Sequence, residues 1–599
     1  MAEHRAEIEA IAAGPWPPTF ADTIEGLERS GTRLHLAERL LEDASGARST
    51  EAVRALEAEM LPRLAAHRDT VGQDPLVFAR IVDLVQRRGS LGLDAEQERV
   101  LDRYHRDIVR AGAALGAGNQ ARLREVNERL SALSAQFRRN LLEETRALAV
   151  RVRTADELDG LPTSMLEAAA RAAEGDGFLL PLSLPSAQPA LEFLHDRALR
   201  ERLYRASAAR GRRGGEHDNR ATVAEIAALR AERDRHEAAL QADGHAGPLE
   251  PWDWPYYAAR ERRERHAVDE TRLQSYFELE RVMRDGVFGI AERLYGLSFT
   301  DLDGAPRPDP DTRVWAVADA DGRERGSLYL DPYARDGKIG GGWLDAYADP
   351  APLLGRLPLV SIKLNITRPA EGAPALLTPL DVRILFHEFG HALHVLLSDV
   401  SYPRVAGLNV PDDVVEFPSK FHEALAFEPD VLARYARHHE TGEALGEPDV
   451  AALGAATRDS AAFWTAQGVA NALLDQAWHG LAPGETVAPE GVDAFEEAVL
   501  DRHDPNLRAV GFNYRSSFFR HVFDGPYAGT QYSYLWSGVL EATARQWLSE
   551  QGGITRAAGD RLRRELLSRG GVVDPIEAFK TITGREPSVR PFLEQRGLI

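Results

Sequence analysis

The amino-acid sequence predicts a mostly α-helical fold with a small β-sheet beside one buried helix. Apolar residues recur at helical spacing through residues 20–150, and the chain again has a helical pattern after about residue 375. Between these parts, the alternation at 313–331 and the apolar run at 357–366 are typical of strands. The sheet is therefore expected in the middle of the chain.

The N-terminal part is expected to form long amphipathic helices. Charged residues fill the positions between the apolar ones, so each helix would bury one face and expose the other. The apolar positions that mark these helices are Leu34, Leu36, Leu40, Leu41, Ile108, Val109, Leu115, Leu123, Val126 and Leu130. Their spacing is too irregular for more than a short coiled coil over residues 95–145.

A proline- and tryptophan-rich junction at residues 247–255 is a plausible domain boundary. We expect an N-terminal helical domain over residues 1–246 and a second domain over residues 247–599. The second domain contains the histidine-rich segment 386–394. In the second domain, Asp321-Gly322 forms the turn of a hairpin. Three adjacent glycines at 340–342 allow the backbone to approach another group closely.

Residues 386–394 read Phe-His-Glu-Phe-Gly-His-Ala-Leu-His. On a helix, His387 and His391 share one face, so they can bind one Zn²⁺ and place Glu388 beside a metal-bound water as its base. The flanking residues are apolar, which indicates a buried helix. Burial without partners costs several kcal/mol, so a metal is favoured over an ordinary helix with two satisfied histidines. The pattern is that of a zinc hydrolase.

A catalytic zinc needs a third protein ligand, and Glu416, in Asp-Val-Val-Glu-Phe-Pro-Ser (413–419), is the best candidate. Glu423 lies about two helical turns further on and would share a face with Glu416 if this segment is helical. Glu423 could then hydrogen-bond the free ring N–H of a ligand histidine. The alternative is that both are solvated charges. We interpret His394 as a satisfied core or hydrogen-bonding histidine rather than a ligand.

The composition narrows the class of protein. The 599 residues are 44% hydrophobic and 28% charged, which fits a soluble globular protein of two or more domains. A net charge of −21 makes nucleic acid and anionic membrane poor partners. The chain has no cysteine, so zinc must bind histidine and carboxylate. No secretory signal or membrane span is predicted, and a cytoplasmic location is the default expectation.

His-Glu-Phe-Gly-His followed at this distance by Val-Glu-Phe-Pro-Ser resembles the thimet oligopeptidase, oligopeptidase A and dipeptidyl carboxypeptidase family of zinc metallopeptidases. Residues 519–527, Phe-Arg-His-Val-Phe-Asp-Gly-Pro-Tyr, resemble the family's second active-site motif. Pro-Pro-Thr-Phe at 17–20, Leu-Glu-Arg-Ser-Gly at 27–31 and Ser-Arg-Gly-Gly at 568–571 resemble the dipeptidyl carboxypeptidase branch. The resemblance implies a zincin, neurolysin-like fold: a helical ellipsoid split by a deep channel with zinc on its floor.

The resemblance also implies roles for Tyr527, Tyr534 and His521, which would face the reacting carbonyl. A neutral tyrosine hydroxyl can donate a hydrogen bond to the oxyanion that forms there. From the residues alone, an aromatic cluster in a helix core is the favoured interpretation of residues 532–536.

The chain departs from the family pattern in several places. These are Pro526 for glycine, Gln531 for tyrosine, Lys420 for glutamine, Leu425 for an aromatic residue, and a shortened stretch between Arg233 and Trp252. Proline fixes φ and removes an N–H, so the loop before Tyr527 should be stiffer. The shortening should reshape the substrate entrance or leave room for a partner subunit.

The predicted function is zinc-dependent hydrolysis of peptide bonds in short peptides, of the oligopeptidase or peptidyl-dipeptidase type, with one Zn²⁺ per chain. One alternative is a specialised zinc amide hydrolase acting on a single small peptide-like metabolite. The other is a non-catalytic peptide-binding relative, against which the intact Glu388 argues. Substrate length, oligomeric state and the choice of Zn²⁺ over Mn²⁺ or Co²⁺ stay open, since affinity alone does not select the metal.

Overall fold

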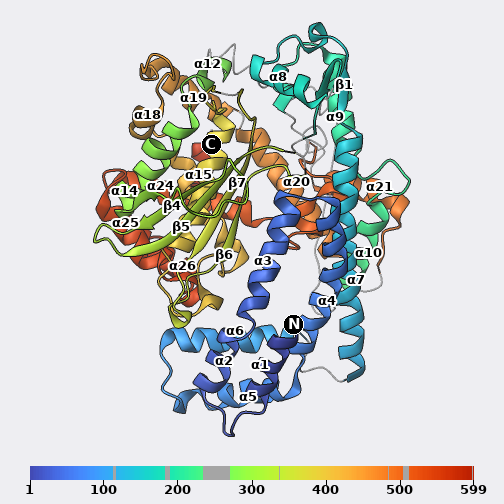
Figure 1. The fold of residues 1–599 in the computed structure, drawn as a ribbon, viewed down its shortest axis with the longest axis vertical. Coiled ribbons are helices and arrows are strands. Elements are labelled where there is room, and N and C mark those ends of the chain that lie inside the picture. The colour runs from blue at the N-terminus through green and yellow to red at the C-terminus, as the bar shows by residue number, and fades with distance from the viewer. Residues whose placement is uncertain are drawn as a thin grey trace.

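The computed structural model describes the chain apart from residues 112, 114–116, 174, 183–188, 234–269, 336, 371, 460, 483–484, 504–510, 597 and 599. The predicted domain boundary at 246/247, the junction at 247–255 and the shortened stretch between Arg233 and Trp252 lie outside the described residues. Helices fill both ends of the chain, and a sheet lies between them in sequence (Figure 1).

The N-terminal part is helical, as predicted, with one short pair of strands. Its helices are α1 (Ala2–Ala12), α2 (Gly26–Arg29), α3 (Thr32–Ala47), α4 (Glu51–Gly72), α5 (Pro75–Gln86), α6 (Ala95–Arg110), α7 (Ala117–Ala147), α8 (Thr163–Ala172), α9 (Arg197–Ala208) and α10 (Arg220–Arg233). Strands β1 (Val150–Val152) and β2 (Phe178–Leu180) pair antiparallel and were not predicted. In Figure 1, α1, α2, α5 and α6 form the base, α7 runs upright along one side, and α3 rises from the base toward the sheet.

The central sheet has the strand order β3-β4-β5-β7-β6. Its strands are β3 (Ser298–Asp301), β4 (Arg313–Ala318), β5 (Glu324–Tyr333), β6 (Trp343–Ala348) and β7 (Leu359–Ile366). The predicted hairpin is confirmed: β4 and β5 pair antiparallel, with Trp315 opposite Leu328. The predicted strand at 357–366 corresponds to β7, which runs parallel to β5, while β6 forms an edge of the sheet.

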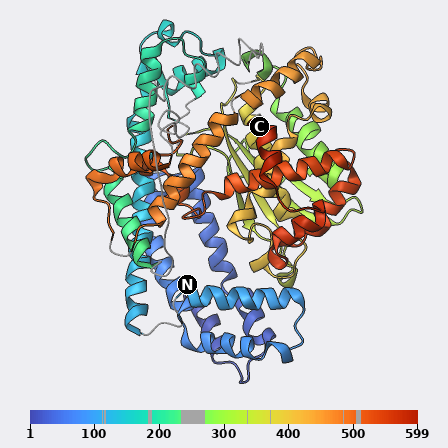
Figure 2. The same ribbon diagram turned by 180° about the vertical axis from the view of Figure 1, so that it is seen from behind.

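The C-terminal part is helical. Its main helices, with the short ones that precede the sheet, are α12 (Glu270–Gln274), α13 (Leu279–Arg281), α14 (Gly289–Tyr295), α15 (Pro379–Leu396), α16 (Asp412–Val415), α17 (Phe417–Leu425), α18 (Pro429–Tyr435), α19 (Glu447–Asp459), α20 (Ala461–His479), α21 (Val492–His503), α23 (Arg520–Phe523), α24 (Ser533–Glu550), α25 (Arg556–Leu562), α26 (Pro575–Thr583) and α27 (Val589–Gln595). Seen from behind in Figure 2, orange and red helices stand in front of the sheet.

Helix α15 is buried between the sheet and the C-terminal helices. It begins at a capping box, in which the Thr378 hydroxyl accepts from the Asp381 N–H and the Asp381 carboxylate accepts from the Thr378 N–H. Phe386, Phe389 and Leu393 are buried in the same core as the apolar residues of β7. The predicted fold class, mostly helical with a small sheet beside this helix, is confirmed.

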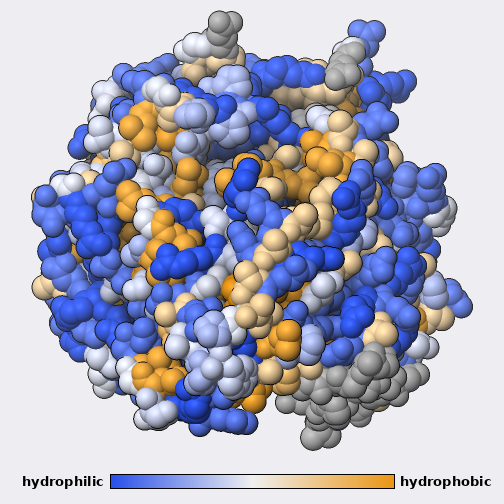
Figure 3. Space-filling view, turned by 60° about the horizontal axis from the view of Figure 1, so that its bottom comes forward, coloured by the Kyte–Doolittle hydropathy of each residue, from blue (hydrophilic) through white to orange (hydrophobic). Residues whose placement is uncertain are grey.

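The molecular surface is largely hydrophilic on the face shown in Figure 3, with apolar residues scattered in small groups. Within the described part of the chain, every helix is too short or too polar to cross a membrane.

Gly390 allows α15 and α17 to approach closely. A Cβ added at Gly390 would lie 2.6 Å from both the Pro418 carbonyl oxygen and the Ser419 Cα. Those atoms belong to the backbone at the start of α17 and cannot rotate away. The absence of a side chain at Gly390 therefore sets the distance between the two helices.

Replacing Gly390 by alanine is expected to destabilise the protein by about 1–3 kcal/mol, because the helices must separate to admit the new methyl group. Urea unfolding followed by circular dichroism measures the change. The matched control is Gly289→Ala in α14, where the nearest atom to a new Cβ is 3.8 Å away and no loss is expected. Equal stability of Gly390→Ala and the wild type would contradict this explanation of the packing.

Candidate metal centre

Three side chains from α15 and the start of α17 converge on one point. The Nε2 atoms of His387 and His391 each lie 3.3 Å from the same Oε2 of Glu416. His387 and His391 are one turn apart on α15, and Glu416 is the residue that joins α16 to α17. Packing of α17 on α15 therefore brings the predicted third carboxylate to the predicted histidine pair.

The donor set fits a divalent transition metal. Two imidazole nitrogens and one carboxylate oxygen, all within 4.8 Å of one another, form a three-residue ligand set of the kind that catalytic zinc sites use. Within the described ranges, no other group of His, Cys, Asp or Glu has this arrangement. Glu416 is 1% exposed, and the Ser419 hydroxyl donates to its Oε2 at 3.0 Å, so the carboxylate is held in one orientation.

His387 and the Glu416 carboxylate of this cluster shift each other's pKa values toward the charged forms. Burial opposes ionisation of Glu416, but His391 and His387 hold the pKa of that carboxyl well below its usual range. Burial likewise lowers the pKa of His387, yet its hydrogen bonds to Glu416 and Glu423 outweigh this and raise that pKa to about 10. The negative charge of the buried Glu416 carboxylate thus attracts a cation to this point.

Glu423 contacts a histidine of the triad, as the sequence predicts. The Nδ1 of His387 lies 3.0 Å from Oε2 of Glu423, and α17 places this carboxylate behind the ring. A carboxylate at Nδ1 fixes the ring so that Nε2 faces Glu416, where a metal could bind. Arg383 and Lys420 also reach Glu423, at 2.7 Å each.

Glu388 is buried beside the triad, and burial raises the pKa of its carboxyl. The predicted close approach of the glycines at 340–342 occurs here, since a Cβ on Gly342 would lie 3.3 Å from Oε1 of Glu388 and 2.4 Å from Ile384 Cγ2. The Asn365 amide from β7 holds this loop by donating to the Ile339 and Gly341 carbonyls at 2.7 and 2.6 Å. The sequence did not indicate this role for Asn365.

The predicted tyrosines and histidine gather on the opposite side of Glu416. The Tyr527 hydroxyl donates to Glu416 Oε1, and the ring centres of Tyr527 and Tyr534 lie 5.1 Å apart. The His521 ring centre lies 6.1 Å from those of both tyrosines. Burial lowers the pKa of His521 to about 4, which keeps this ring neutral. The structure thus brings all three residues together beside the triad.

Asp475 of α20 holds the loop between His521 and Tyr534. Its two carboxylate oxygens accept from the Gly529 and Gln531 N–H groups, each at 2.9 Å. This residue was not among those predicted from the sequence. Its signal is an acidic side chain within the largely apolar stretch 470–478, where burial without a partner would be costly.

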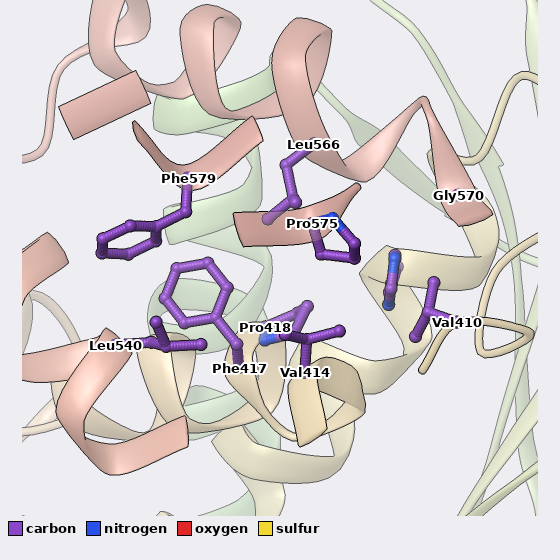
Figure 4. Close-up of a pocket in the computed structure, with 10 residues that line it drawn as sticks. Val410, Val414, Phe417, Pro418, Leu540, Leu566, Gly570, Pro575 and Phe579 are labelled. Carbon is purple, nitrogen blue, oxygen red and sulfur yellow. The ribbon is translucent and has the colours of Figure 1, made fainter. Parts of the chain in front are cut away.

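His394 is buried, as expected, but it is not satisfied in the expected way. No hydrogen-bond partner of its Nδ1 lies among the described residues. It borders a cavity of about 10 Å³, room for about one water molecule. Figure 4 shows the apolar wall of that cavity, including Val410, Phe417 and Phe579. His394 lies outside the metal triad.

Comparison with known proteins decides the family. The profile of peptidase family M3 matches residues 232–598. The chain belongs to peptidase family M3. It is 35% identical to dipeptidyl carboxypeptidase of Salmonella typhimurium, over 100% of this chain and 94% of that protein. It is 30% identical to oligopeptidase A of Escherichia coli, over 99% of this chain and 95% of that protein.

Solved structures share the fold of this M3 peptidase. A putative oligoendopeptidase F has a TM-score of 0.53 at 16% identity, covering 100% of this chain and 94% of that chain. PZ peptidase A, solved with an inhibitor, has a TM-score of 0.51 at 13% identity with the same two coverages. The family match and the two curated relatives confirm the predicted family resemblance and the prediction that the chain is a peptidase, and the solved structures confirm the fold.

Glu541 of α24 is a buried carboxyl near Glu423. It is 6% exposed, its Oε1 has no hydrogen-bond partner in the described part of the chain, and the Arg545 Nε lies 3.8 Å away. Burial, reinforced by the charge of Glu423, raises the pKa of Glu541 to about 7 from its ordinary 4.5. The folded protein therefore keeps a proton that the unfolded chain releases between these two pH values.

Because the folded-state pKa is raised, ionisation of Glu541 lowers the free energy of unfolding as the pH rises from about 4.5 toward 7, and the full cost is present above 7. Glu541→Gln is expected to stabilise the protein by about 1–3 kcal/mol at pH 8 and by less than half of that at pH 5. Urea unfolding at the two pH values measures the gain. Glu550→Gln, at an exposed position on the same helix, should change stability by less than about 1 kcal/mol. An equal gain at both pH values for Glu541→Gln would show that ionisation is not the cause.

Proposed function

We propose that this M3 peptidase is zinc-dependent and hydrolyses peptide bonds in short peptides. The observation that carries the proposal is the convergence of His387, His391 and Glu416 beside the buried Glu388. His387, His391 and Glu416 would hold the ion. When bound there, zinc supplies Lewis-acid polarisation of the substrate carbonyl and lowers the pKa of the attacking water.

Glu388 is assigned as the general base. Its carboxylate accepts a proton from the attacking water and returns it to the amine that leaves, so the carboxyl passes through its protonated form. A buried carboxyl with a raised pKa suits this exchange, because proton uptake costs less than at an ordinary glutamate. Gly342 brings the backbone of the glycine loop close to this carboxylate, since a Cβ there would lie 3.3 Å from Oε1 of Glu388.

Tyr534, Tyr527 and His521 are assigned to the charge that develops on the carbonyl oxygen. Each can donate a hydrogen bond while neutral, and burial raises the pKa of both tyrosines, so both keep their protons. In the structure the single hydroxyl proton of Tyr527 is donated to Glu416, so Tyr527 can donate to the oxyanion only when that hydrogen bond is released. Losing one such donor typically costs about 3–4 kcal/mol of transition-state stabilisation.

Two relatives are named oligopeptidase A and dipeptidyl carboxypeptidase. These names support short peptides as substrates and the release of C-terminal dipeptides as one mode of cleavage. Pairing of an extended peptide with β6, an edge strand next to the glycine loop, would supply recognition of the substrate backbone. A cytoplasmic location fits a peptidase of this kind.

Glu388→Gln is expected to bind one zinc per chain while peptide cleavage falls by at least about a thousandfold, because the amide keeps the shape of the side chain but cannot take the proton. Metal analysis of the purified protein and mass spectrometry of a short-peptide mixture give the two readouts. Chelator should abolish cleavage by the wild type. Cleavage by Glu388→Gln at the wild-type rate would remove Glu388 from the mechanism.

Peptides with free and amidated C-termini separate the two modes of cleavage. A peptidyl-dipeptidase recognises the terminal carboxylate, so amidation should slow the release of dipeptides by at least about tenfold, the loss expected from one missing charged hydrogen bond. Product masses identify the bond that is cut. Equal cleavage rates for the free and amidated peptides, with cuts away from the C-terminal dipeptide, would indicate activity of the oligopeptidase type. Zinc binding without cleavage of any peptide in the mixture would contradict the proposed substrate class.

A further inference from the structure

Glu423 accepts from three cationic or potentially cationic groups on two helices. Lys420 Nζ and His387 Nδ1 share its Oε2, at 2.7 and 3.0 Å, and Arg383 Nη2 contacts its Oε1 at 2.7 Å. Arg383 lies one turn before His387 on α15, and Lys420 lies one turn before Glu423 on α17. Both oxygens of the carboxylate behind the metal ligand are thus capped by a full positive charge.

The position of these cations matters because Glu423 acts on the metal site through one imidazole ring. A carboxylate that accepts from Nδ1–H pulls on that proton and makes Nε2 a stronger electron donor. A cation on the same oxygen withdraws electron density from the carboxylate and weakens that pull. Lys420 and His387 compete for one oxygen, so Lys420 opposes the effect of Glu423 on the metal ligand.

Among the described residues, other charged groups lie near Glu423 but do not contact it directly. The charges of Lys420 and Arg383 hold the pKa of Glu423 well below its usual range, although burial opposes ionisation. Glu541 and Arg596 are the next charged groups, and Arg545 is engaged with Glu428 at 2.6 Å. Lys420 and Arg383 are thus the cations in direct contact with Glu423.

We propose that Lys420, together with Arg383, is a positioning residue that sets the strength of zinc binding by neutralising Glu423. Glu423 then orients the His387 ring while adding little negative charge to the ligand set. The inference rests on the proposed zinc site. Removing the charge of Lys420 should therefore tighten zinc binding. If Lys420 served only to hold the structure together, its removal would weaken zinc binding instead.

The test is competition with a chromophoric zinc chelator at fixed pH and ionic strength. Lys420→Gln should bind zinc about three- to tenfold more tightly than the wild type, and Lys420→Arg should restore the wild-type affinity. Lys580→Gln is the matched control, since Lys580 also pairs with a glutamate three residues away, at 2.9 Å, but far from the triad in the sequence. In a Glu423→Gln background, Lys420→Gln should have no effect, because the charge it neutralises is gone.

Weaker or unchanged zinc binding by Lys420→Gln would overturn the inference, since weaker binding is the result of a purely structural support. Tighter binding that persists in the Glu423→Gln background would overturn it too, because the effect would not pass through Glu423. A wild-type protein that binds no zinc would instead contradict the proposed function. Circular dichroism and urea unfolding confirm that each variant is folded before its affinity is compared.

Discussion

The close contact between α15 and α17 is the constraint on which the site depends. Without a side chain at Gly390, the backbone of Pro418 and Ser419 lies directly against α15. That contact places Glu416 between two histidine nitrogens and Glu423 behind one of them. Phe417 and Phe421 anchor the same short helix in the core, so the distance between ligands is set by apolar packing rather than by the charges themselves.

The N-terminal helices contribute to the same site from a distance along the chain. Arg138 of α7 pairs with Asp524 at 2.5 Å, directly before the loop that carries Tyr527. Asp43 of α3 pairs with Lys363 of β7 at 2.6 Å and so ties the N-terminal part to the sheet beside the glycine loop. These buried ion pairs join parts of the chain that are hundreds of residues apart. Breaking one partner of such a pair is costly because the other charge stays buried.

Helical periodicity made the histidine pair predictable from the sequence, whereas Glu416 was proposed because a zinc site needs a third ligand. Residues spaced by three, four or seven positions share a helix face, which is why the sequence alone groups His387 with His391 and Glu416 with Glu423. The hairpin at 313–331 was predictable because alternation and a turn signal coincide there. Strands β1, β2, β3 and β6 were missed because each is too short for its pattern of apolar residues to be recognised.

Contacts between side chains and distant backbone could not be predicted in the same way. Asp475 binds N–H groups more than fifty residues away, and Asn365 binds the carbonyls of a preceding loop. No local spacing encodes such pairs, since they depend on how the elements pack. The engagement of the Tyr527 hydroxyl with Glu416 and the unpartnered Nδ1 of His394 likewise required the three-dimensional arrangement.

X-ray absorption at the zinc edge tests the central assignment most directly. We expect two imidazole nitrogens and one carboxylate oxygen at about 2.0–2.2 Å, with a further light ligand completing the shell. The spectrum should lose one imidazole in His391→Ala and the carboxylate in Glu416→Ala. A shell with fewer than two imidazoles in the wild type, or a spectrum unchanged by these substitutions, would place the metal elsewhere and contradict the assignment of His387, His391 and Glu416 as its ligands.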